Sequence, residues 1–441
     1  MRTLPLPRKK TTLESGTGAI TSSLSYKIHN MSVATSASHH WVLAVQHWML
    51  DIQKIKVLER KKRFEQMITA IDTRWIFKEI SGIGVYTKEI IKNIIELDTE
   101  NTYILLFSDS EIQASLEKEL KLDKADNFKS IKVDFGIFSI QNQLKLNKLL
   151  VSHDVNVYHS TNYMIPLLPK FGRASKIKYV VTIHDIIPLL FRDHAPKSKK
   201  SRIFPIFKAI MNRIAKQADV ILTVSNASKI DIEKYFNIPK NTKVHALYNA
   251  CSEMFQPIPF EDKEKMQFLY VGRADPYKDV GTIIKAIDIL VKKGYEDIKL
   301  ILAGSPDTRY NNTKELTEKL GISKNIRWTG YISNEELVKL YQESTALLHP
   351  SLYEGFGLQI IEAMQSGTPV ISSDGGSLKE ICADAAIVLP PKSPKLFAEN
   401  IEKLINSEAL QKELIAKGLS RAKKFSWNKT AKDIISRYGQ D

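Results

Sequence analysis

The sequence predicts an α/β protein built from two doubly wound lobes, and three observations lead to this prediction. At 441 residues the chain is longer than one hydrophobic core comfortably serves. From Met67 onward, short β-branched runs alternate with amphipathic helical stretches, which is typical of βαβ units with a parallel sheet. A charged, proline-containing stretch at 253–265 interrupts the alternation, which then restarts. We therefore expect a first lobe over residues 67–252 and a second lobe over residues 266–441.

The expected strands follow from these runs. Those of the first lobe are Met67–Asp72, Tyr103–Phe107, Val155–His159, Tyr179–His184, Val220–Val224 and Val244–Tyr248; those of the second are Phe268–Val271, Lys299–Ala303, Ile326–Trp328, Ala346–His349 and Val370–Ser373. Ligands of such sheets bind at the carboxyl ends of the strands. The residues that follow each strand are therefore the informative ones.

Residues 1–66 form an N-terminal extension of unknown role. They are rich in Ser and Thr up to Ser38 and carry 11 basic and 4 acidic side chains. A basic leader with few acids can be a transit peptide, but a regular strand pattern begins only at Met67. We expect the folded part of the chain to start there.

Composition narrows the class of protein. The apolar fraction of 43% and the charged fraction of 26% are those of a globular chain rather than a disordered or fibrous one. Cys251 and Cys382 lack a CxxC spacing, which favours buried thiols in a reducing compartment. Charge or proline interrupts every long apolar run, so we expect no membrane-spanning segment.

The net charge of +15 belongs to the N-terminal half. Residues 67–260 carry 27 basic and 20 acidic side chains, whereas residues 261–441 carry 26 and 25. Such a bias suits an anionic membrane surface, a phosphate-bearing substrate or a nucleic acid, and does not choose among them.

Two motifs follow strands of the first lobe. Gly82 and Gly84 open a helix after the first strand, where glycine lets the backbone approach a phosphate at the helix N-terminus; the alternative is a flexible loop. His184 and Asp185 end a strongly apolar strand, and a polar pair there needs water or a ligand as its partner. The alternative is a satisfied structural histidine. His159 is a second histidine at a strand end, with a weaker claim.

Two further motifs follow strands of the second lobe. Arg273 and Lys278 flank the start of a helix, an arrangement that neutralises a pyrophosphate; the alternative is a surface ion pair. The sequence contains no Asp-x-Asp metal signature, so the two cations would replace a metal ion. Glu354 lies in a glycine-rich loop after the strand ending at His349, and Glu362 lies in the helix that follows. Their carboxylates can accept hydrogen bonds from sugar hydroxyls.

These motifs and their order resemble glycosyltransferase family 4, the GT-B enzymes marked by two glutamates with seven residues between them, here Glu354 and Glu362. The resemblance extends from about Met67 to Tyr438. It implies a GT-B fold of two Rossmann-like lobes facing a central cleft. The first lobe would serve the acceptor and the second the nucleotide sugar, and the last helix would cross back to the first lobe.

The resemblance also implies roles for the site residues. Arg273 and Lys278 would bind the donor diphosphate, which Gly84 would approach from the first lobe. Glu362 would hold the ribose, and His184 would contact the transferring sugar near the reacting carbon.

Glu354 would be the second catalytic residue, beside the transferred sugar, with the backbone of Phe356, Gly357 and Leu358 near its hydroxyls or the phosphate. The family retains anomeric configuration. No carboxylate suits a double displacement, so we expect front-face transfer without a metal or cofactor.

Within the family, the segments Ser160–Pro166 and His184–Pro188 look most similar to bacterial mannosyltransferases of surface-polysaccharide and lipopolysaccharide assembly. GDP-mannose is then the expected donor, ahead of UDP- and dTDP-sugars, and the acceptor a glycan or a lipid-linked glycan. The basic amphipathic stretch Lys197–Lys216 either lies on an anionic leaflet or packs on the sheet with its lysines in solvent. We expect a cytoplasmic protein, with peripheral contact to the inner face of the membrane under the first alternative.

Two other functions compete with transfer. The same scaffold can carry a nucleotide-sugar epimerase, because fold does not determine function. The charge alone suggests a nucleic-acid-binding protein, but the aromatic residues are not interleaved with the basic runs, so we expect no nucleic-acid partner.

Overall fold

The computed structural model describes residues 66–78, 81–191, 204–304 and 312–439. The expectation for residues 1–66 therefore lies outside the described residues, apart from Gln66. Residues 67–441 form one unit that contains two parallel sheets.

The first lobe is a seven-stranded sheet in the order β3-β2-β1-β4-β5-β6-β7, with every neighbouring pair parallel. Its strands are β1 (Ile68–Asp72), β2 (Thr102–Phe107), β3 (Phe128–Lys132), β4 (Val157–Ser160), β5 (Lys178–Ile183), β6 (Val220–Thr223) and β7 (Lys243–Ala246). Its helices are α3 (Gly82–Leu97), α4 (Ser110–Leu120), α5 (Ile140–Ser152), α6 (Ile187–Leu190), α8 (Phe204–Gln217) and α9 (Asn226–Tyr235), with short 3-10 turns η1 (Leu122–Lys124) and η2 (Gly172–Lys176).

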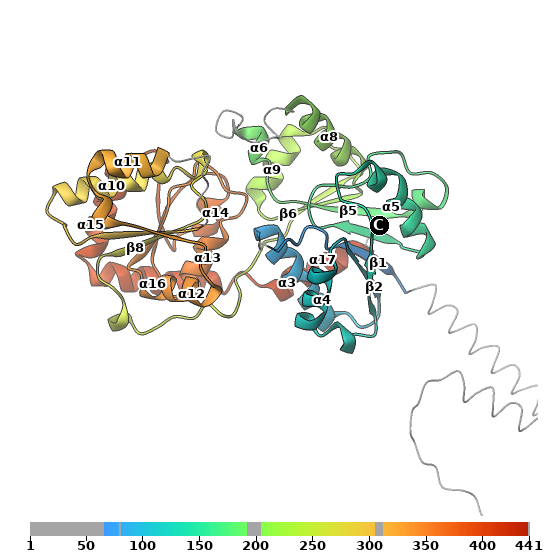
Figure 1. Cartoon of the computed structure of the whole chain (residues 1–441), viewed down its shortest axis with the longest axis horizontal. Coiled ribbons are helices and arrows are strands. Elements are labelled where there is room, and N and C mark those ends of the chain that lie inside the picture. Colours follow the sequence, from blue (N-terminus) through green and yellow to red (C-terminus); the bar gives the residue numbers. More distant parts are fainter. Residues whose placement is uncertain (1–65, 79–80, 192–203, 305–311, 440–441) are drawn as a thin grey trace, which may run out of the picture. The chain divides into compact units, whose positions relative to one another are not determined.

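Helices cover both faces of this sheet (Figure 1). α5, α8 and α9 share one apolar core with the sheet, to which Leu146, Met211 and Ile232 belong. α3 and α4 share the other core, to which Ile90 and Leu116 belong. The doubly wound arrangement of the first lobe therefore follows from two separate apolar layers.

The second lobe is a six-stranded parallel sheet in the order β10-β9-β8-β11-β12-β13. Its strands are β8 (Gln267–Val271), β9 (Lys299–Ala303), β10 (Ile326–Gly330), β11 (Ala346–His349), β12 (Val370–Ser373) and β13 (Ile387–Leu389). Its helices are α10 (Val280–Lys292), α11 (Asn312–Leu320), α12 (Asn334–Glu343), α13 (Leu358–Gln365), α14 (Leu378–Cys382), α15 (Pro394–Ile405) and α16 (Glu408–Ala422), with 3-10 turns η3 (Phe260–Asp262), η4 (Pro276–Lys278) and η5 (Ser323–Asn325).

The predicted α/β class with two doubly wound lobes is confirmed. Two strands were not predicted from the sequence, β3 and β13, and both lie at sheet edges. β3 is largely exposed and β13 has only three residues, so neither shows the apolar run by which a central parallel strand is recognised.

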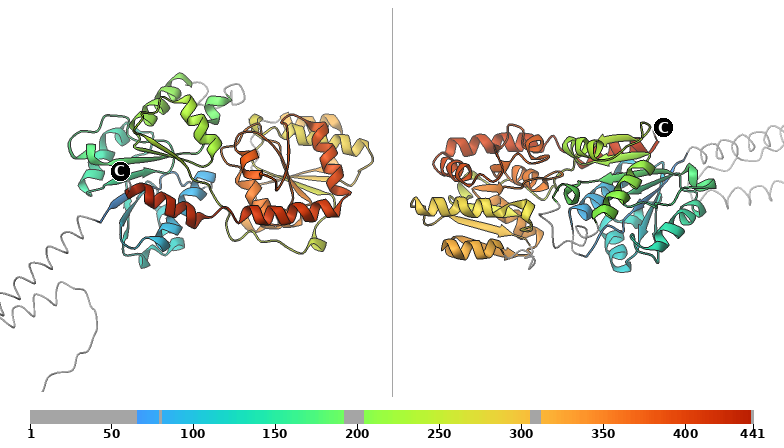
Figure 2. Two further views of the ribbon diagram at one scale, coloured as in Figure 1. Left: turned by 180° about the vertical axis from the view of Figure 1, so that it is seen from behind. Right: turned by 90° about the horizontal axis from the view of Figure 1, so that it is seen from above.

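The last helix, α17 (Trp427–Gly439), follows α16 of the second lobe but packs against α3 of the first. Figure 2 shows the two helices side by side. Trp427, Ile434 and Tyr438 are buried in the same core as α3, and the Tyr438 hydroxyl lies 2.7 Å from His159 Nδ1. Residues far apart in the sequence thus complete one layer of the first lobe.

The sequence favours buried, free thiols for both cysteines. Cys382 is buried and Cys251 is half-buried, and both are free thiols. Burial raises the pKa of Cys382 to about 12.

Among the described helices, none combines the length and the apolar character that crossing a bilayer requires.

Truncating Ile434 tests the role of α17. Because Ile434 is fully buried against α3, Ile434→Ala should lower the free energy of unfolding by about 2–5 kcal/mol, as other large-to-small core substitutions do. Urea denaturation measures this change. Lys432→Ala, at an exposed position of the same helix, is the matched control. Equal stabilities of the two variants would contradict this packing.

Candidate active site

The predicted site residues of the second lobe follow two neighbouring strands. β8 and β11 pair in parallel, so the segments after them leave from the same edge of the sheet. Arg273 and Lys278 follow β8, and Glu354 follows β11. The parallel pairing therefore brings cations and a carboxylate together, as the sequence predicts for strand ends.

Glu354 is the centre of a buried charge cluster. Lys278 Nζ lies 2.6 Å and His349 Nε2 lies 3.2 Å from the same oxygen, Glu354 Oε1. Burial alone would raise the pKa of Glu354, but the Lys278 ammonium and the His349 hydrogen bond outweigh it and lower the pKa to about 2. Glu354 is therefore ionised at any physiological pH.

This pairing gives Lys278 a partner within the chain, and its expected role at a diphosphate stays a prediction. The sequence suggested that its ammonium binds a diphosphate, whereas in this structure it contacts Glu354. Arg273 keeps a more open position: its side chain is 56% exposed, and its guanidinium lies 2.9 Å from Asp275 Oδ2. Of the two predicted cations, Arg273 is thus the one that faces solvent.

Two glycines shape the loop that carries Glu354. A Cβ on Gly355 would lie 2.6 Å from the carbonyl oxygen of His184, so only glycine lets the loop lie against the His184–Asp185 segment. Gly357 has φ +87° and is the N-cap of α13, which no described side chain caps. The N–H groups of the first turn of α13 can therefore bind an anion or a hydroxyl oxygen.

The side chains flanking Gly357 do not point to a ligand-binding role of their own. Phe356 is buried and packs near Tyr248 and Phe425. Leu358 is half-buried beside the core of α13. The expectation that residues 356–358 act through their backbone therefore remains a prediction, compatible with these positions.

His184 is held in one tautomer. Its Nε2 lies 3.0 Å from the carbonyl oxygen of Thr161, which can only accept, so Nε2 carries the hydrogen. Burial lowers the pKa of His184 to about 4, so the ring is neutral at pH 7 and Nδ1 is a hydrogen-bond acceptor. The ring of Tyr86 packs edge-on against it, with ring centroids 4.8 Å apart.

His159, the other histidine at a strand end, is a structural residue. It is fully buried, with Thr182 and Tyr438 hydroxyls as its partners. Burial lowers its pKa to about 3.

Gly84 lies in the first turn of α3, where its N–H donates to the N-cap side chain of Ser81 at 3.3 Å. That donor is therefore already used within the loop. Within the described residues, no hydrogen bond or ion pair links Gly84 with Arg273 or Lys278. The approach of Gly84 to a diphosphate stays a prediction.

Glu362 lies on α13, where one carboxylate oxygen accepts a hydrogen bond of 2.8 Å from the buried Tyr341 hydroxyl. Burial raises the pKa of Glu362 to about 7, and the Tyr341 hydrogen bond opposes this shift. Glu354 and Glu362 therefore differ strongly in charge state although the sequence presents them as a pair.

Sequence reasoning missed the residues that join the two lobes at this site. Ser225 Oγ donates to the carbonyl oxygen of Gly355 at 2.7 Å, and Ser228 Oγ lies 3.0 Å from the carbonyl oxygen of His184. The signal that could have revealed them is the Ser-x-x-Ser motif after β6, since Ser225 also caps α9. These two hydroxyls connect the His184 and Glu354 loops.

Glu380 was also missed. Its carboxylate accepts hydrogen bonds from the backbone N–H groups of Asn226 and Ala227, both at 3.1 Å, and from the Tyr248 hydroxyl at 2.5 Å. A carboxylate of the second lobe thus occupies the N-terminus of a helix of the first, where the helix dipole favours negative charge.

A small pocket of about 90 Å³ adjoins His184. Its polar lining includes Asn162 and Asp185, and its apolar lining includes Phe207 and Met211 of α8. Asn162 Oδ1 accepts from the Tyr163 N–H, while no described hydrogen bond uses its amide nitrogen. This side chain is another one that the sequence did not single out.

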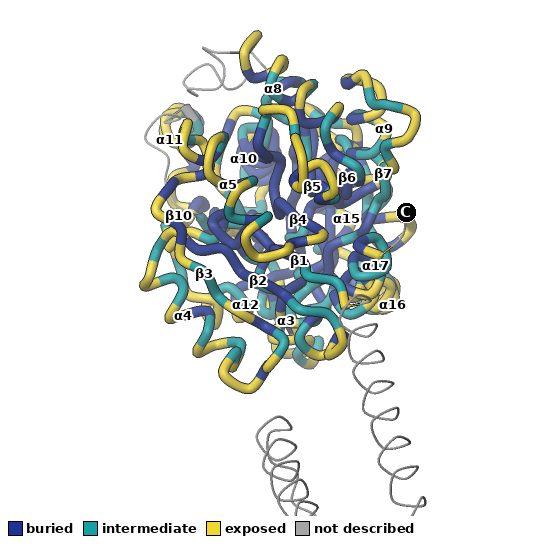
Figure 3. Tube along the Cα trace, turned by 90° about the vertical axis from the view of Figure 1, so that its right-hand side faces the viewer, coloured by how far each residue is buried: buried dark blue, intermediate teal, exposed yellow. Residues whose placement is uncertain are grey.

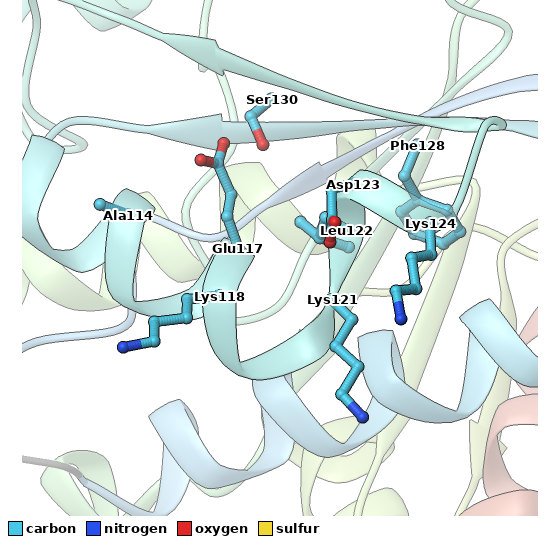
Figure 4. A pocket seen from close by; sticks show the side chains of 9 residues that line it. All are labelled: Ala114, Glu117, Lys118, Lys121, Leu122, Asp123, Lys124, Phe128 and Ser130. Carbon is cyan, nitrogen blue, oxygen red and sulfur yellow. The ribbon is translucent and has the colours of Figure 1, made fainter.

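A separate surface pocket lies around α4, η1 and β3, and Figure 4 shows the side chains that line it. None of the site residues predicted from the sequence lines it. In the described part of the chain, no cluster of three or more His, Cys, Asp or Glu side chains is arranged to hold a metal ion.

Comparisons with known proteins agree with this geometry. The family model "Glycosyltransferase Family 4" matches residues 80–252, and the model "Glycosyl transferases group 1" matches residues 252–421. The chain is 30% identical over 292 residues to the O-antigen chain mannosyltransferase B of Escherichia coli, covering 64% of this chain and 74% of that protein.

Two other similarities add detail. The chain is 28% identical over 269 residues to the serotype-specific mannosyltransferase WbdA of Escherichia coli, and it spans only 32% of that longer protein. The fold matches the crystal structure of HepE from Anabaena in complex with UDP and glucose, with a TM-score of 0.63 at 17% identity over 84% of this chain and 99% of that one. At this identity the structural match shows a shared fold.

The charge cluster makes a testable prediction. Lys278→Met should destabilise the protein by about 3–5 kcal/mol, because it leaves the buried Glu354 carboxylate with His349 alone. Urea denaturation of the variant measures the loss. The double variant Lys278→Met/Glu354→Gln, which removes the unpaired charge, should recover most of the stability. A double variant as unstable as the single one would contradict the pairing.

Glu362 makes a second prediction, on pH. Its folded-state pKa of about 7 exceeds the ordinary value of 4.5, so the folded chain binds this proton more tightly than the unfolded chain. This carboxyl therefore lowers the free energy of unfolding as pH rises from about 4.5 through about 7. Denaturation curves between pH 5 and pH 8 should show a shallower fall in Glu362→Gln than in the parent, with the exposed Glu335→Gln as control. Identical slopes in the parent and Glu362→Gln would refute the shift.

Proposed function

Since this chain belongs to glycosyltransferase family 4 and is a hexosyltransferase, we propose that it transfers a mannosyl group from GDP-mannose to a glycan or lipid-linked acceptor in polysaccharide assembly. The observation that carries the proposal is the ionised Glu354, buried against Lys278 and His349, in a loop that Ser228 joins to the His184 segment. Mannose and the O-antigen pathway are supported by the relatives, which are named as mannosyltransferases.

The donor would lie on the second lobe. The exposed Arg273 guanidinium and the uncapped N-terminus of α13 offer positive charge to a diphosphate. Glu362 would accept hydrogen bonds from the ribose hydroxyls. Glu354 would accept one from a hydroxyl of the transferred sugar, since its carboxylate stays charged.

The mechanism we propose is front-face transfer with retention of anomeric configuration. Two partners hold Glu354 Oε1, which suits a fixed hydrogen-bond acceptor better than a nucleophile. The His184 ring is neutral, and its unprotonated Nδ1 would accept a hydrogen bond from a sugar hydroxyl near the reacting carbon. Arg273, Lys278 and the α13 N-terminus would stabilise the leaving diphosphate in place of a metal ion.

The acceptor would approach from the first lobe. The pocket beside His184 is lined by first-lobe residues only, and its volume of about 90 Å³ suits one hydroxyl-bearing group rather than a whole sugar ring. The Asn162 amide could donate to such a hydroxyl. We propose that the reaction takes place in the cytoplasm at the inner face of the membrane, a location that the two free thiols suit.

Neither alternative drawn from the sequence is favoured. Family membership accounts for the cleft residues without an epimerase. The charge bias that suggested a nucleic-acid-binding protein is compatible with an anionic substrate.

Donor binding is the first test. In a thermal-shift panel of nucleotide sugars, GDP-mannose should stabilise the full chain by a few degrees, because a ligand that binds only the folded state raises its stability. Arg273→Ala should abolish the shift, whereas Glu354→Gln should keep most of it and lose transfer. Lys403→Ala, on α15 away from the predicted site, serves as the control.

Four outcomes would change the proposal or parts of it. A selective thermal shift with a UDP- or dTDP-sugar would show that this sugar nucleotide, and not GDP-mannose, is the donor. The absence of a shift with any nucleotide sugar would overturn the proposal. Loss of activity in a metal chelator would overturn metal independence. An inverted anomeric centre in the product, seen by NMR, would exclude retention.

A further inference from the structure

The first lobe exposes a group of large apolar side chains on the side formed by α5, the segment 166–171 and α8, which we call the α5–α8 face. Its exposed apolar members are Phe138, Ile140, Leu144, Leu168, Phe171 and Ile206. Ile140 and Phe171 are the most exposed, at 79% and 78%. The six members of this face are nearly half of the thirteen exposed large apolar side chains in the described residues. The exposed apolar surface is therefore concentrated on one side.

Hydrogen bonds show that these parts are contiguous. The N–H of Leu167 donates to Gln143 of α5 at 2.5 Å. Arg213 and Gln217 of α8 donate to the carbonyl oxygens of Leu167 and Leu168, at 3.1 and 3.2 Å. The segment 166–171 is thus fastened between the two helices. Figure 3 looks onto this side of the lobe and shows exposed stretches on both helices.

The charge around this face is predominantly positive. The segments 135–153, 155–184 and 204–218 contain no Asp or Glu, and they carry Lys145, Lys148, Lys170, Arg173, Lys176, Lys178, Lys208, Arg213 and Lys216. Asp134, Asp154 and Asp219, at the borders of these segments, pair with three of them. Lys148 and Lys208 form no ion pair within the described part of the chain. The segments that carry the apolar side chains therefore supply nine cations, and three bordering carboxylates neutralise only part of this charge.

The structure also bears on the two alternatives that the sequence left open for the basic stretch Lys197–Lys216. The stretch 197–216 was expected to be the membrane-binding element or to pack on the sheet, and residues 197–203 lie outside the described residues. In α8, Phe207, Met211 and Ile214 are buried in the lobe core, so the packing alternative holds for the described part. α8 contributes only Ile206 and its cations to the face; α5, Phe138 just before it and the segment 166–171 contribute the other apolar members.

We propose that the α5–α8 face docks on an anionic lipid bilayer. Exposed apolar side chains at the acyl boundary, flanked by Lys and Arg at the headgroups, are the pattern of an interfacial membrane contact. A second copy of the chain would present the same cations to this face, so like charges oppose a symmetric dimer. Phe207 and Met211, on the buried side of α8, also line the pocket beside His184, so the same helix borders both the face and that pocket.

Vesicle flotation of the full chain tests the proposal. Binding should be at least about tenfold stronger to vesicles of phosphatidylglycerol with phosphatidylcholine than to phosphatidylcholine alone, and should weaken with salt. Ile140→Glu/Phe171→Glu should reduce binding at least about tenfold, and Lys148→Glu/Lys208→Glu should reduce it most at low salt. Ile230→Glu, at a 62% exposed position of α9, should bind like the parent.

Two results would overturn the proposal. One is unchanged flotation of both double variants, which would place any membrane contact elsewhere. The other is a parent that ignores vesicles but forms dimers that Ile140→Glu/Phe171→Glu disrupts, which would make the face a protein interface. The donor thermal shift, measured on the same variants, should stay unchanged, so failure of the docking proposal and failure of the transferase proposal remain distinguishable.

Discussion

The ion pair between Lys278 and Glu354 is the constraint on which the site depends. It joins the segment after β8 to the segment after β11, with His349 as the third member. A buried carboxylate needs such partners because burial without them is costly. Since both partners of Glu354 belong to the second lobe, that lobe fixes the charge and the orientation of the carboxylate by itself.

The first lobe then meets this preformed centre through a few polar contacts. Ser225 and Ser228 bind the carbonyl groups of the Glu354 and His184 loops, and α9 holds the Glu380 carboxylate. Gly355 removes the side chain that would keep the loops apart. The arrangement separates two tasks: charge is set within one lobe, and the relative position of the reacting groups is set by contacts between the lobes. Opening the lobes would break the second set and leave the first intact.

Much of this organisation could be predicted from the sequence. Strand ends identified His184, Arg273 and Glu354, because apolar strands flanked by polar residues are a local signal. The partners of those residues could not be predicted, since Glu354–Lys278 and Glu380–Asn226 join positions that only tertiary structure brings together. The same reason applies to the exposed face of α8. The spacing of its apolar residues predicts an amphipathic helix, but only the packing of α5 and the segment 166–171 shows which apolar side chains remain exposed.

The return of α17 to the first lobe has a consequence for synthesis. The apolar side of α3 is covered by side chains that are synthesised only after the whole second lobe, among them Ile434 and Tyr438. Domains of a nascent chain generally fold in the order in which they emerge. Here the first lobe can complete its core only after the second lobe and α17 have left the ribosome. The finished chain therefore closes its first lobe last, and a truncated product would expose the uncovered face of α3 to chaperones and proteases.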